Sequence, residues 1–373
     1  MRTKIIQVEP SNAQPGQLSE AVHIINNGGL VSFPTETVYG IACKVENSSL
    51  VRLNQIKGRP PEKHYALHIA CKEEADKYVP QMSLRISKLV QGGWPGPLTI
   101  VFSLSSSDMK QISEEMSSEV VEHLYRDKSI GIRCPAGKIA FLVLNGSRAA
   151  TVAPSANISG ARPATTAQQV LEQLDGKIDL LIDGGPCRYK KSSTVVKIED
   201  GNLAVLRQGV YSSKEVEVLS EVRILLLCTG NTCRSPMAEG FFKQYAARNL
   251  GCRVDQLSEK GYKILSAGTV GVAGLPASPE AIAACRAKGI DIRGHRSRAL
   301  SKELIEGSDL IFAMSHGHCE AAGRLSKEGA SKCEVLDEGS DIADPIGCTL
   351  KEYKRCAKRI EDAVKKRIEK VQL

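Results

Sequence analysis

Short apolar runs alternate with stretches of helical spacing along the chain, so strands and helices are predicted in both halves. In the first 210 residues, apolar and β-branched runs predict strands at 29–35, 98–104, 129–135 and 193–198. Apolar residues recur at helical spacing over 18–28 and 166–176, which predicts two helices. The first half is therefore expected to be an α/β fold.

The second half alternates more regularly. Its pattern predicts strands and helices in turn: a strand at 222–228, a helix from Ser235, a strand at 262–269, a helix at 278–289, a strand at 309–315 and a long helix from about residue 349. Alternation of this kind is typical of a parallel sheet with helices on both of its faces.

A polar, charged stretch separates the two halves near residues 208–222. We predict a linker at 211–220, between one domain at 5–210 and another at 221–373. Both lengths are ordinary for single domains.

The net charge of +8 is spread over the chain. Residues 1–210 hold 24 Lys and Arg against 20 Asp and Glu, and the remainder holds 26 against 22, so each part carries +4. There is no basic arm or tail. A mild positive balance suits phosphate-bearing small substrates as well as nucleic acid and does not choose between them.

Cysteine content and the lengths of the apolar runs indicate the cellular compartment to expect. The chain has 12 cysteines and begins without the apolar stretch of a signal peptide, so a reducing cytoplasm is expected. No run approaches 18 apolar residues, and we expect no membrane association. No Cys or His spacing indicates a zinc site, so no protein-bound metal is expected.

The stretch CTGNTCR, at 228–234, leaves an apolar strand and enters a predicted helix. Ser235 is expected to cap that helix, with Pro236 in its first turn. Backbone N–H groups and the helix dipole would then converge on one point and form an anion site. Gly230 and Asn231 are expected to supply the positive φ angles of a tight loop.

A thiol held in such a loop experiences positive potential, which favours the thiolate of Cys228. Arg234 can bind a phosphoryl group with two parallel hydrogen bonds, and Ser235 can donate a hydrogen bond to the thiolate. The chemistry that fits is thiolate attack on phosphorus, which gives a phosphocysteine intermediate. A general acid is also needed; Asp344, in the stretch DIADPIG, is a candidate, although Asp-Pro by itself is typical of a turn.

Five motifs of the second half occur in one order: CTGNTCRSPMAEG, SAGT, SPEAIAACRAKGIDIRGHRSRAL, SDLIFAMSHGH and DPIG. In this order they resemble the low-molecular-weight protein-tyrosine-phosphatase family over nearly all of 221–373. The resemblance implies Cys228 as nucleophile, Arg234 as phosphate clamp and Asp344 as general acid, and no metal at the site. Ser235 and Asn231 would organise the loop. Cys233 matches a cysteine that forms a protective disulfide with the nucleophile.

The substrate of the second half is left open between three classes. Aromatic side chains that would wall a phosphotyrosine ring are scarce around these motifs. Thr232 stands where tyrosine-specific members commonly carry a bulky aliphatic residue, and it resembles the protein-arginine-phosphatase branch. Phosphoarginine is therefore favoured over phosphotyrosine. Arsenate reduction is a third hypothesis; it needs two further cysteines close together, and Cys319 and Cys333 are 14 positions apart. His316 and His318 are interpreted as surface residues.

Polar residues of the first half occur in pairs spaced by two: Lys57 with Arg59, and Ser155 with Asn157. In an extended segment such pairs point to the same face, so each is expected to project two groups into one cavity. Two cations with spaced hydroxyl and amide groups suit a triphosphate or a small carboxylate.

With FPTETVYGIAC, WPGPLTIVF, GIRCPA, KSSTVV and LRQG, these pairs resemble the YrdC-like L-threonylcarbamoyladenylate synthase family across about 5–210. The resemblance implies a twisted α/β fold around a concave cavity. It also implies the conversion of L-threonine, bicarbonate and ATP, with Mg²⁺ on the phosphates, to threonylcarbamoyl-AMP and pyrophosphate. A downstream tRNA-modifying transferase machinery would use the product to modify tRNA.

The same resemblance distributes roles among residues. The threonine side would be formed by Thr35, His68, Arg133, Ser155 and Ser193. The ATP side would be formed by Lys57, Arg59, Lys63, Ser129, Asn157, Thr165 and Arg207. Lys63 stands where the family often has asparagine, and Ala161 is an extra residue before the segment that contains Thr165. An RNA-binding module without catalysis is the competing hypothesis; the low aromatic content argues against it.

Overall fold

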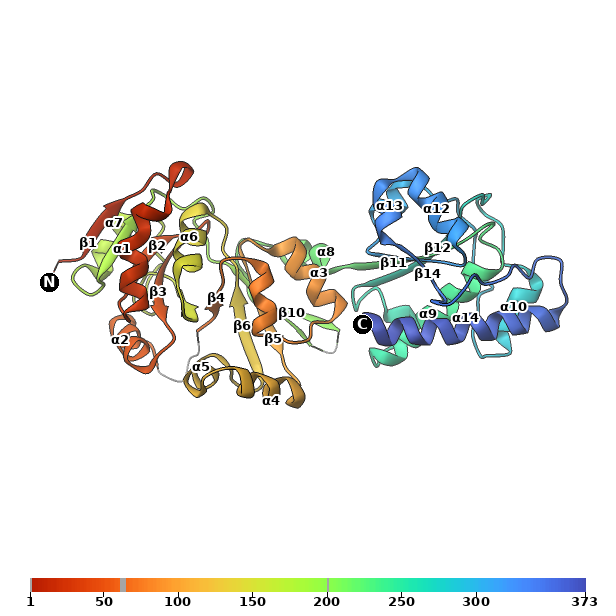
Figure 1. Ribbon diagram of the computed structural model, residues 1–373, viewed down its shortest axis with the longest axis horizontal. Helices are drawn as coiled ribbons and strands as arrows, with labels where there is room; N and C mark the ends of the chain where they lie inside the picture. Colours follow the sequence, from red (N-terminus) through yellow and green to blue (C-terminus); the bar gives the residue numbers. More distant parts are fainter. Residues whose placement is uncertain (1, 61–64, 200) are drawn as a thin grey trace. The chain divides into compact units, whose positions relative to one another are not determined.

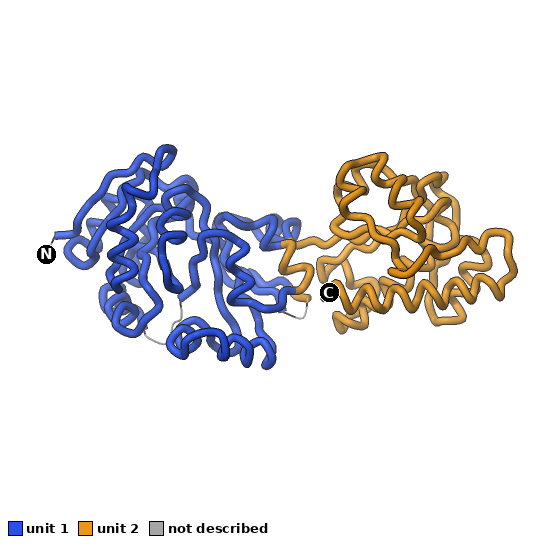
Figure 2. The backbone as a smooth tube through the Cα atoms, viewed as in Figure 1, with its two compact units in different colours: residues 1–82, 89–199, 203–219 blue, residues 83–88, 200–202, 220–373 orange. Residues whose placement is uncertain are grey.

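The computed structural model describes residues 2–60, 65–199 and 201–373. The chain divides into two compact units (Figure 2): residues 1–82, 89–199 and 203–219 form the first, and residues 83–88, 200–202 and 220–373 form the second. The stretch predicted as a linker contains the helix α8 (Ser213–Ser220). The first unit extends through residue 219.

One sheet dominates the first half of the chain. Its ten strands within the described residues are β1 (Lys4–Gln7), β2 (Val31–Pro34), β3 (Tyr39–Lys44), β4 (Leu67–His68), β5 (Leu98–Ser103), β6 (Ser129–Arg133), β7 (Thr151–Val152), β8 (Leu180–Asp183), β9 (Thr194–Glu199) and β10 (Asn202–Arg207). They lie in the order β1-β8-β2-β3-β7-β4-β6-β5-β9-β10. Parallel and antiparallel pairs are both present: β5 runs antiparallel to β6 and parallel to β9. The sheet is therefore mixed.

The register of the central strands brings polar side chains together. His68 on β4 lies beside Arg133 on β6, and Arg133 lies opposite Thr99 on β5. Paired positions on neighbouring strands share a face of the sheet. Three residues from distant parts of the sequence thus lie in one row.

The helices of the first half pack around the sheet (Figure 1). They are η1 (Pro10–Asn12), α1 (Pro15–Asn26), α2 (Asn47–Lys57), η2 (Lys72–Lys77), α3 (Leu84–Gly93), α4 (Ser106–Glu115), α5 (Ser118–Leu124), α6 (Lys138–Gly146), α7 (Ala167–Leu174) and α8. Leu18 and Ile25 of α1 pack with Val143 of α6 against Phe33 and Ile182 of the sheet, all fully buried. Burial of these side chains holds the helices on the strands.

The predicted elements of the first half are confirmed with shifts of one to three residues. Strands are found at β2, β5, β6 and β9, and helices at α1 and α7. The sequence analysis predicted no strand at β1, β3, β4, β7 or β8. For β4 and β7 the reason is that a strand of two residues contains too little alternation to recognise. Both exist through their tertiary pairing with each other and with β3 and β6.

The second unit contains a parallel sheet of four strands in the described residues, in the order β12-β11-β13-β14. The strands are β11 (Val222–Cys228), β12 (Tyr262–Gly268), β13 (Leu310–Ala313) and β14 (Cys333–Val335). The helices are α9 (Arg234–Asn249), η3 (Val254–Gln256), α10 (Pro279–Arg286), α11 (Lys302–Glu306), α12 (His316–Leu325), α13 (Lys327–Lys332) and α14 (Leu350–Val371).

Both faces of this sheet are covered (Figure 1). Ile224 and Leu226 of β11 belong to one buried cluster with residues of α9 and α14. Leu225 and Leu227 belong to a second cluster with residues of α11 and α12. Burial on both faces explains why β11 is an unbroken apolar run rather than an alternating one. The prediction of a parallel sheet between helices is confirmed.

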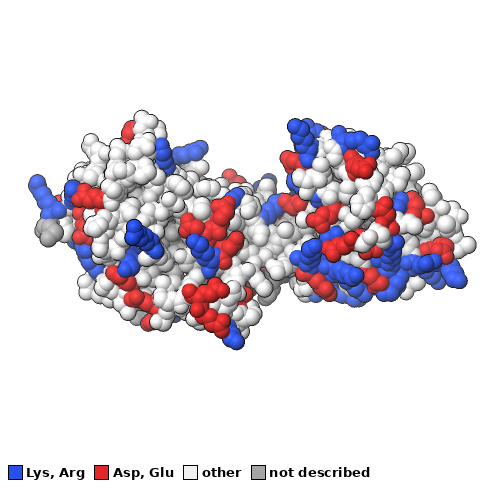
Figure 3. Space-filling view, viewed as in Figure 1, with Lys and Arg blue, Asp and Glu red and all other residues white. Residues whose placement is uncertain are grey.

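Charged residues of both signs are interspersed over the visible surface (Figure 3). In the part of the chain that the structure describes, no helix combines the length and apolar character needed to cross a membrane.

Candidate functional sites

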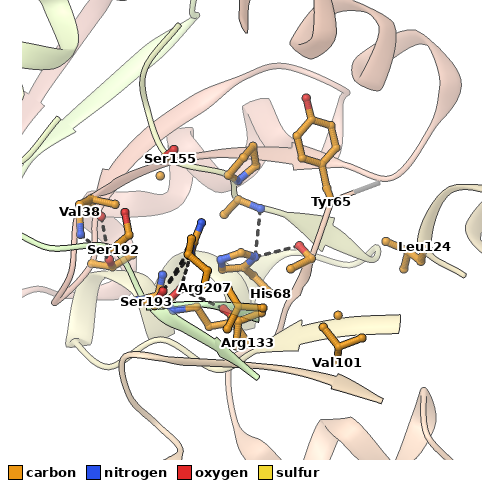
Figure 4. Close-up of a pocket in the computed structure, with 18 of the residues that line it drawn as sticks. Val38, Tyr65, His68, Val101, Leu124, Arg133, Ser155, Ser192, Ser193 and Arg207 are labelled. Atoms are coloured by element: carbon orange, nitrogen blue, oxygen red, sulfur yellow. Dashed lines mark hydrogen bonds between the residues drawn. The ribbon is translucent and has the colours of Figure 1, made fainter. Parts of the chain in front are cut away.

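A cavity of about 460 Å³ opens in the first unit over the row formed by β4, β5 and β6 (Figure 4). Eight of the predicted binding residues line it: Thr35, Arg59, His68, Ser129, Arg133, Ser155, Ser193 and Arg207. The structure thus brings together side chains that the sequence spreads over more than 170 positions.

Arg133 is the most tightly held charge in this cavity. Its side chain is 7% exposed, and Nη2 donates to Glu36 Oε1 at 2.8 Å and to Thr37 Oγ1 at 2.7 Å. Its Nε is buried without a hydrogen-bond partner. A buried guanidinium needs a carboxylate to offset its desolvation.

Glu36 is a residue that the sequence analysis did not assign. Its other oxygen, Oε2, accepts from the backbone N–H of Ala136 at 3.0 Å. Glu36 therefore fixes both Arg133 and the loop that follows β6. In the sequence, Glu36 stands between two threonines at the end of a predicted strand. That position marks it as a candidate, but it does not identify Arg133 as its partner.

His68 is buried beside Arg133. Burial, and then the charge of Arg133, lower its pKa to about 3, so the imidazole is neutral at pH 7. Its Nδ1 lies 3.2 Å from the backbone N of Ala153 and 3.1 Å from the carbonyl of Ala66. Acceptance from Ala153 leaves the proton on Nε2.

Arg207 reaches back to the start of β9. Its Nε and Nη2 donate to the carbonyl of Ser193 at 3.3 and 2.9 Å, and Nη2 also donates to Ser193 Oγ at 3.0 Å. Burial lowers the pKa of Arg207, and Arg133 adds to that effect. Two guanidinium groups in one cavity make it suitable for anions.

The expectation that Lys57 and Arg59 point to one face is wrong. Lys57 ends helix α2, and Gly58 follows in the left-handed conformation, so this segment is not extended. Lys57 Nζ donates to the carbonyls of Ser155 and Asn157 at 2.5 and 2.7 Å beneath the loop. Burial, and then Arg59, lower its pKa to about 8. Arg59 alone lines the cavity.

The pair Ser155 and Asn157 departs from expectation in the same way. Ser155 lines the cavity, but Asn157 Nδ2 donates to the carbonyls of Ile158 and Ala161 and closes a turn. The extra residue Ala161 thus supplies an acceptor.

A further predicted ATP residue, Thr165, is not among the residues that line the cavity. Thr165 Oγ1 lies 3.0 Å from Gln169 Oε1 and donates to it. Lys63 lies outside the described residues.

The second candidate site is the loop after β11. Cys228 Sγ lies 2.9 Å from Ser235 Oγ, and the backbone N–H of Asn231 points at the sulfur from 3.3 Å. Asn231 is fully buried; its Nδ2 donates to Ser235 Oγ at 2.9 Å and to Ser266 Oγ at 2.8 Å. Its Oδ1 accepts from the backbone N of Arg298 at 2.8 Å. This one side chain ties the loop to β12 and to the segment at 298.

Two local predictions about this loop are wrong. Helix α9 begins at Arg234, with Cys233 at the N-cap position, so Ser235 lies inside the first turn instead of capping it. There its hydroxyl faces the sulfur. Asn231 has φ 54°, but Gly230 is not among the residues with positive φ.

Arg234 is buried beneath the loop, as Arg133 is buried in the first unit. Its Nη1 donates to the carbonyl of Ile342 at 2.9 Å, and Nη2 donates to Thr229 Oγ1 at 3.2 Å and to Asp344 Oδ2. Its Nε is buried without a partner. Asp344 is about one third exposed and lies 110 positions after Arg234 in the sequence. Its contact with Arg234 places its carboxylate beside the loop.

Two histidines of this site were not recognised from the sequence. His318 is buried, contrary to the surface interpretation, and its ring lies between Thr229 Oγ1 at 3.0 Å and Ser315 Oγ at 2.7 Å. Burial and then Arg234 lower its pKa. His295 Nε2 lies 2.8 Å from the carbonyl of Asn231. His316 is exposed and pairs with Asp341, as expected of a surface residue.

The remaining predicted residues of the loop are Thr232 and Cys233, and Cys233 is buried. Thr232 is partly exposed in the loop. Cys233 Sγ contacts Tyr353 OH at 3.3 Å and Ser278 Oγ at 3.5 Å. Among the described residues, no three His, Cys, Asp or Glu side chains are grouped to hold a metal ion.

Comparison with known proteins agrees with this division. Residues 23–209, half of the chain, match the Sua5/YciO/YrdC family model, described as "Telomere recombination". Residues 223–373 match the model of the low-molecular-weight phosphotyrosine protein phosphatases. Both are families of enzymes. The chain belongs to the Sua5/YciO/YrdC family and carries a low-molecular-weight phosphatase domain after it.

Relatives of the first half are named threonylcarbamoyl-AMP synthase. One from Pyrococcus abyssi is 33% identical over 229 residues, which cover 61% of this chain and 64% of the relative. One from Bacillus subtilis is 29% identical over 204 residues, which cover 54% and 56%. The chain therefore spans less than two thirds of either relative.

Solved structures match both halves. A variant of Sua5 from P. abyssi is 26% identical with a TM-score of 0.51, covering 71% of this chain and 91% of that chain. A low-molecular-weight protein tyrosine phosphatase from T. tengcongensis is 37% identical with a TM-score of 0.36, covering 40% of this chain and 99% of that chain.

Asn231 combines a left-handed backbone with three buried side-chain hydrogen bonds, and two variants separate these contributions. Asn231→Gly removes the bonds but tolerates φ 54°, and should lower the free energy of unfolding by about 2 kcal/mol. Asn231→Ala removes the same bonds, but alanine, unlike glycine, has a Cβ that is strained at this φ. It should lower the free energy of unfolding by roughly 1 kcal/mol more than Asn231→Gly does. Urea unfolding followed in the second unit measures both. Equal midpoints for the two variants would show that the backbone conformation is not under constraint.

His68 should make the stability of the first unit depend on acid. Its pKa is 6.5 when unfolded and about 3 when folded, so the unfolded state binds a proton that the folded state excludes between these values. The contribution of the neutral His68 to the free energy of unfolding is therefore fully present above pH 6.5. It falls as the pH is lowered towards 3, by at most about 1.4 kcal/mol per pH unit. His68→Asn keeps an acceptor near the Nδ1 position without titrating. The difference in unfolding free energy between wild type and variant should shrink from pH 6.5 to 4.5; a constant difference contradicts the buried neutral imidazole.

Proposed function

We propose that the protein is bifunctional: an L-threonylcarbamoyladenylate synthase at about 5–210 and a cysteine-dependent protein phosphatase at about 221–373. One observation carries the proposal. Among the described residues, three buried side-chain polar atoms lack a hydrogen-bond partner, and two of them are Nε of Arg133 and Nε of Arg234. An unpaired buried donor is costly, so each site is prepared for an anion.

In the first unit the anion would be the carboxylate of L-threonine, bound by Arg133. The name of the relatives, threonylcarbamoyl-AMP synthase, supports threonylcarbamoyl-AMP as the product. The substrates L-threonine, bicarbonate and ATP are those that the motif resemblance implies. The amine of threonine attacks bicarbonate and water leaves; the carbamate oxygen then attacks the α-phosphorus of ATP and pyrophosphate leaves. Arg59 and Arg207 would neutralise the phosphates, and Mg²⁺ would be carried by ATP. Catalysis rests on positioning and charge stabilisation.

Lys57 and Asn157 would act indirectly in this reaction. Lys57 donates to the carbonyls of Ser155 and Asn157, and Asn157 donates to the carbonyls of Ile158 and Ala161. These bonds would fix the segment that presents Ser155 to the cavity. Ser129 and Thr35 would complete the walls. A role of Lys63 or Thr165 toward ATP stays a proposal that rests on the motif alone.

In the second unit the thiolate of Cys228 attacks the phosphorus of a phosphorylated protein. The S–P bond forms, the bond to the leaving group breaks, and Asp344 donates its proton to that group. Water activated by Asp344 then cleaves the phosphocysteine. The substrate phosphoryl group would take over the Arg234 donors that now contact Asp344 and Thr229.

Phosphoarginine is the favoured substrate. Thr232 is partly exposed in the loop, and its hydroxyl can contact a guanidinium, whereas an aromatic ring needs apolar or aromatic walls. Phosphotyrosine is the second candidate.

Arsenate reduction is not favoured by the arrangement of the sulfur atoms. Cys228 and Cys233 belong to the buried cluster with α9 and α14, whereas Cys319 and Cys333 pack against the cluster on the other face of the sheet. A relay of disulfides from Cys228 would have to cross the sheet.

The two activities should be separable by single substitutions. Arg59→Ala should lower threonine-dependent pyrophosphate release at least about 100-fold, because it removes a preorganised charge from the cavity, and should leave phosphatase activity unchanged. Cys228→Ser should do the reverse, with a loss of at least about 1,000-fold in phosphatase kcat. Arg148→Ala and Cys348→Ser, on the surface, are the matched controls. Full pyrophosphate release by Arg59→Ala would refute the synthase site, and RNA binding without release would favour a binding module.

The specificity of the phosphatase is tested at Thr232. The wild type should show kcat/KM for phosphoarginine peptides at least about 10-fold above that for phosphotyrosine peptides. Thr232→Ile should narrow or invert this ratio, and Thr232→Ser should retain it because the hydroxyl remains. A wild-type preference for phosphotyrosine would reject the phosphoarginine proposal while leaving the phosphatase proposal intact.

A further inference from the structure

Two cysteines outside both candidate sites lie against each other in the second unit. Cys319 ends the first turn of α12, and Cys333 begins the edge strand β14. Their sulfur atoms are 2.8 Å apart. A disulfide bond is about 2.05 Å long, so an approach of less than about 1 Å separates this pair from a bond. The pair is therefore preformed by the fold.

The two thiols are not equivalent. The Cys333 S–H donates to the sulfur of Cys319, and this hydrogen bond lowers the pKa of Cys319 and raises the pKa of Cys333. Both side chains are partly exposed, whereas Cys43, Cys134 and Cys285 are buried. A thiolate that is accessible and has a second thiol beside it has the features of a redox-active cysteine.

Neither of the other uses of a cysteine pair fits as well. A metal ion would need a third ligand, and no such group of His, Cys, Asp or Glu occurs among the described residues. A disulfide relay to Cys228 does not fit either, because Cys228 and the Cys319–Cys333 pair pack in hydrophobic clusters on opposite faces of the sheet.

We propose that Cys319 and Cys333 form a redox-active dithiol, which a hydroperoxide oxidises to a disulfide between α12 and β14. The thiolate of Cys319 attacks the terminal oxygen of the hydroperoxide; an S–O bond forms, the O–O bond breaks and an alcohol, or water from hydrogen peroxide, leaves. Cys333 then attacks the sulfenic sulfur, the S–S bond forms and water leaves. The pair loses two electrons and the peroxide gains them, and a thiol reductant reverses the change.

The bond would fasten an element that supports the phosphatase loop. Cys319 directly follows His318, whose ring contacts Thr229, and β14 is a three-residue strand at the edge of the sheet. The disulfide would close the chain between 319 and 333 into a ring that contains α13. Because the sulfur atoms already meet, oxidation should tighten this region without rearranging it.

The test uses the full-length protein and hydrogen peroxide. The reduced, folded protein is treated with a slight excess of peroxide, free thiols are blocked with N-ethylmaleimide, and the unreduced protein is cleaved after glutamate. Peptides 307–320 and 329–334 each contain one cysteine, Cys319 and Cys333 respectively. Mass spectrometry should find these two peptides joined, with the loss of two hydrogens, at least ten-fold faster than Cys348, an exposed single thiol, is oxidised.

Two variants test the order of the steps. Cys333→Ser should leave Cys319 as a sulfenic acid that dimedone labels several-fold more than in the wild type. Cys319→Ser should leave Cys333 largely unlabelled, because burial still raises the pKa of the Cys333 thiol when the contact with Cys319 is gone. Circular dichroism confirms that each variant is folded, and the wild-type peptide analysis stands even where a variant is not.

Three results would overturn the proposal. Cys319 and Cys333 could both remain open to N-ethylmaleimide after Cys348 has reacted. Cys319 could instead be joined to another cysteine, such as Cys228. The oxidised wild type could unfold at a lower temperature than the reduced protein, which would show that the bond distorts the fold. An unchanged or raised unfolding temperature, with the 307–320 to 329–334 link, supports it.

Discussion

Both candidate sites depend on a buried arginine that must be paired with a carboxylate. Arg133 and Arg234 are 6% and 5% exposed, and each is held by one acidic partner and by neutral acceptors. A guanidinium cannot give up its proton, so burial without a partner would cost several kcal/mol. The strands and loops that carry Glu36 and Asp344 must therefore lie where they do. In each case Nε is buried without a hydrogen-bond partner.

The ion pairs Glu36–Arg133 and Asp344–Arg234 would respond differently to substrate binding. Glu36 is buried with Arg133 and also holds the backbone of Ala136, so this carboxylate belongs to the framework of the cavity. Asp344 is about one third exposed on a loop after β14, and it contacts an arginine donor that a phosphoryl group would also use. The first pair is therefore part of the framework of the cavity. Under the proposed mechanism, a phosphoryl group would take the Arg234 donor and release the Asp344 carboxyl for proton transfer.

Sequence motifs predicted the cavity-lining residues better than local geometry did. Eight of the twelve binding residues inferred for the first unit line the cavity, and the loop from Cys228 to Ser235 has the contacts expected of a thiolate site. The reasoning from spacing failed at Lys57 and Asn157. It assumed an extended chain, whereas the segments are a helix end and a turn. Local spacing fixes the direction of a side chain only when the local conformation is known.

The sequence by itself determined the two families, their α/β class and the long strands and helices, because these depend on continuous runs of residues. Tertiary structure alone decided which distant side chains meet. It placed His68 beside Arg133 through the two-residue strand β4, paired Arg133 with Glu36, and buried His318 against Thr229. It also brought Cys319 to 2.8 Å from Cys333 across 14 positions. Contacts of this kind follow from strand order and packing, and no local pattern in the sequence records them.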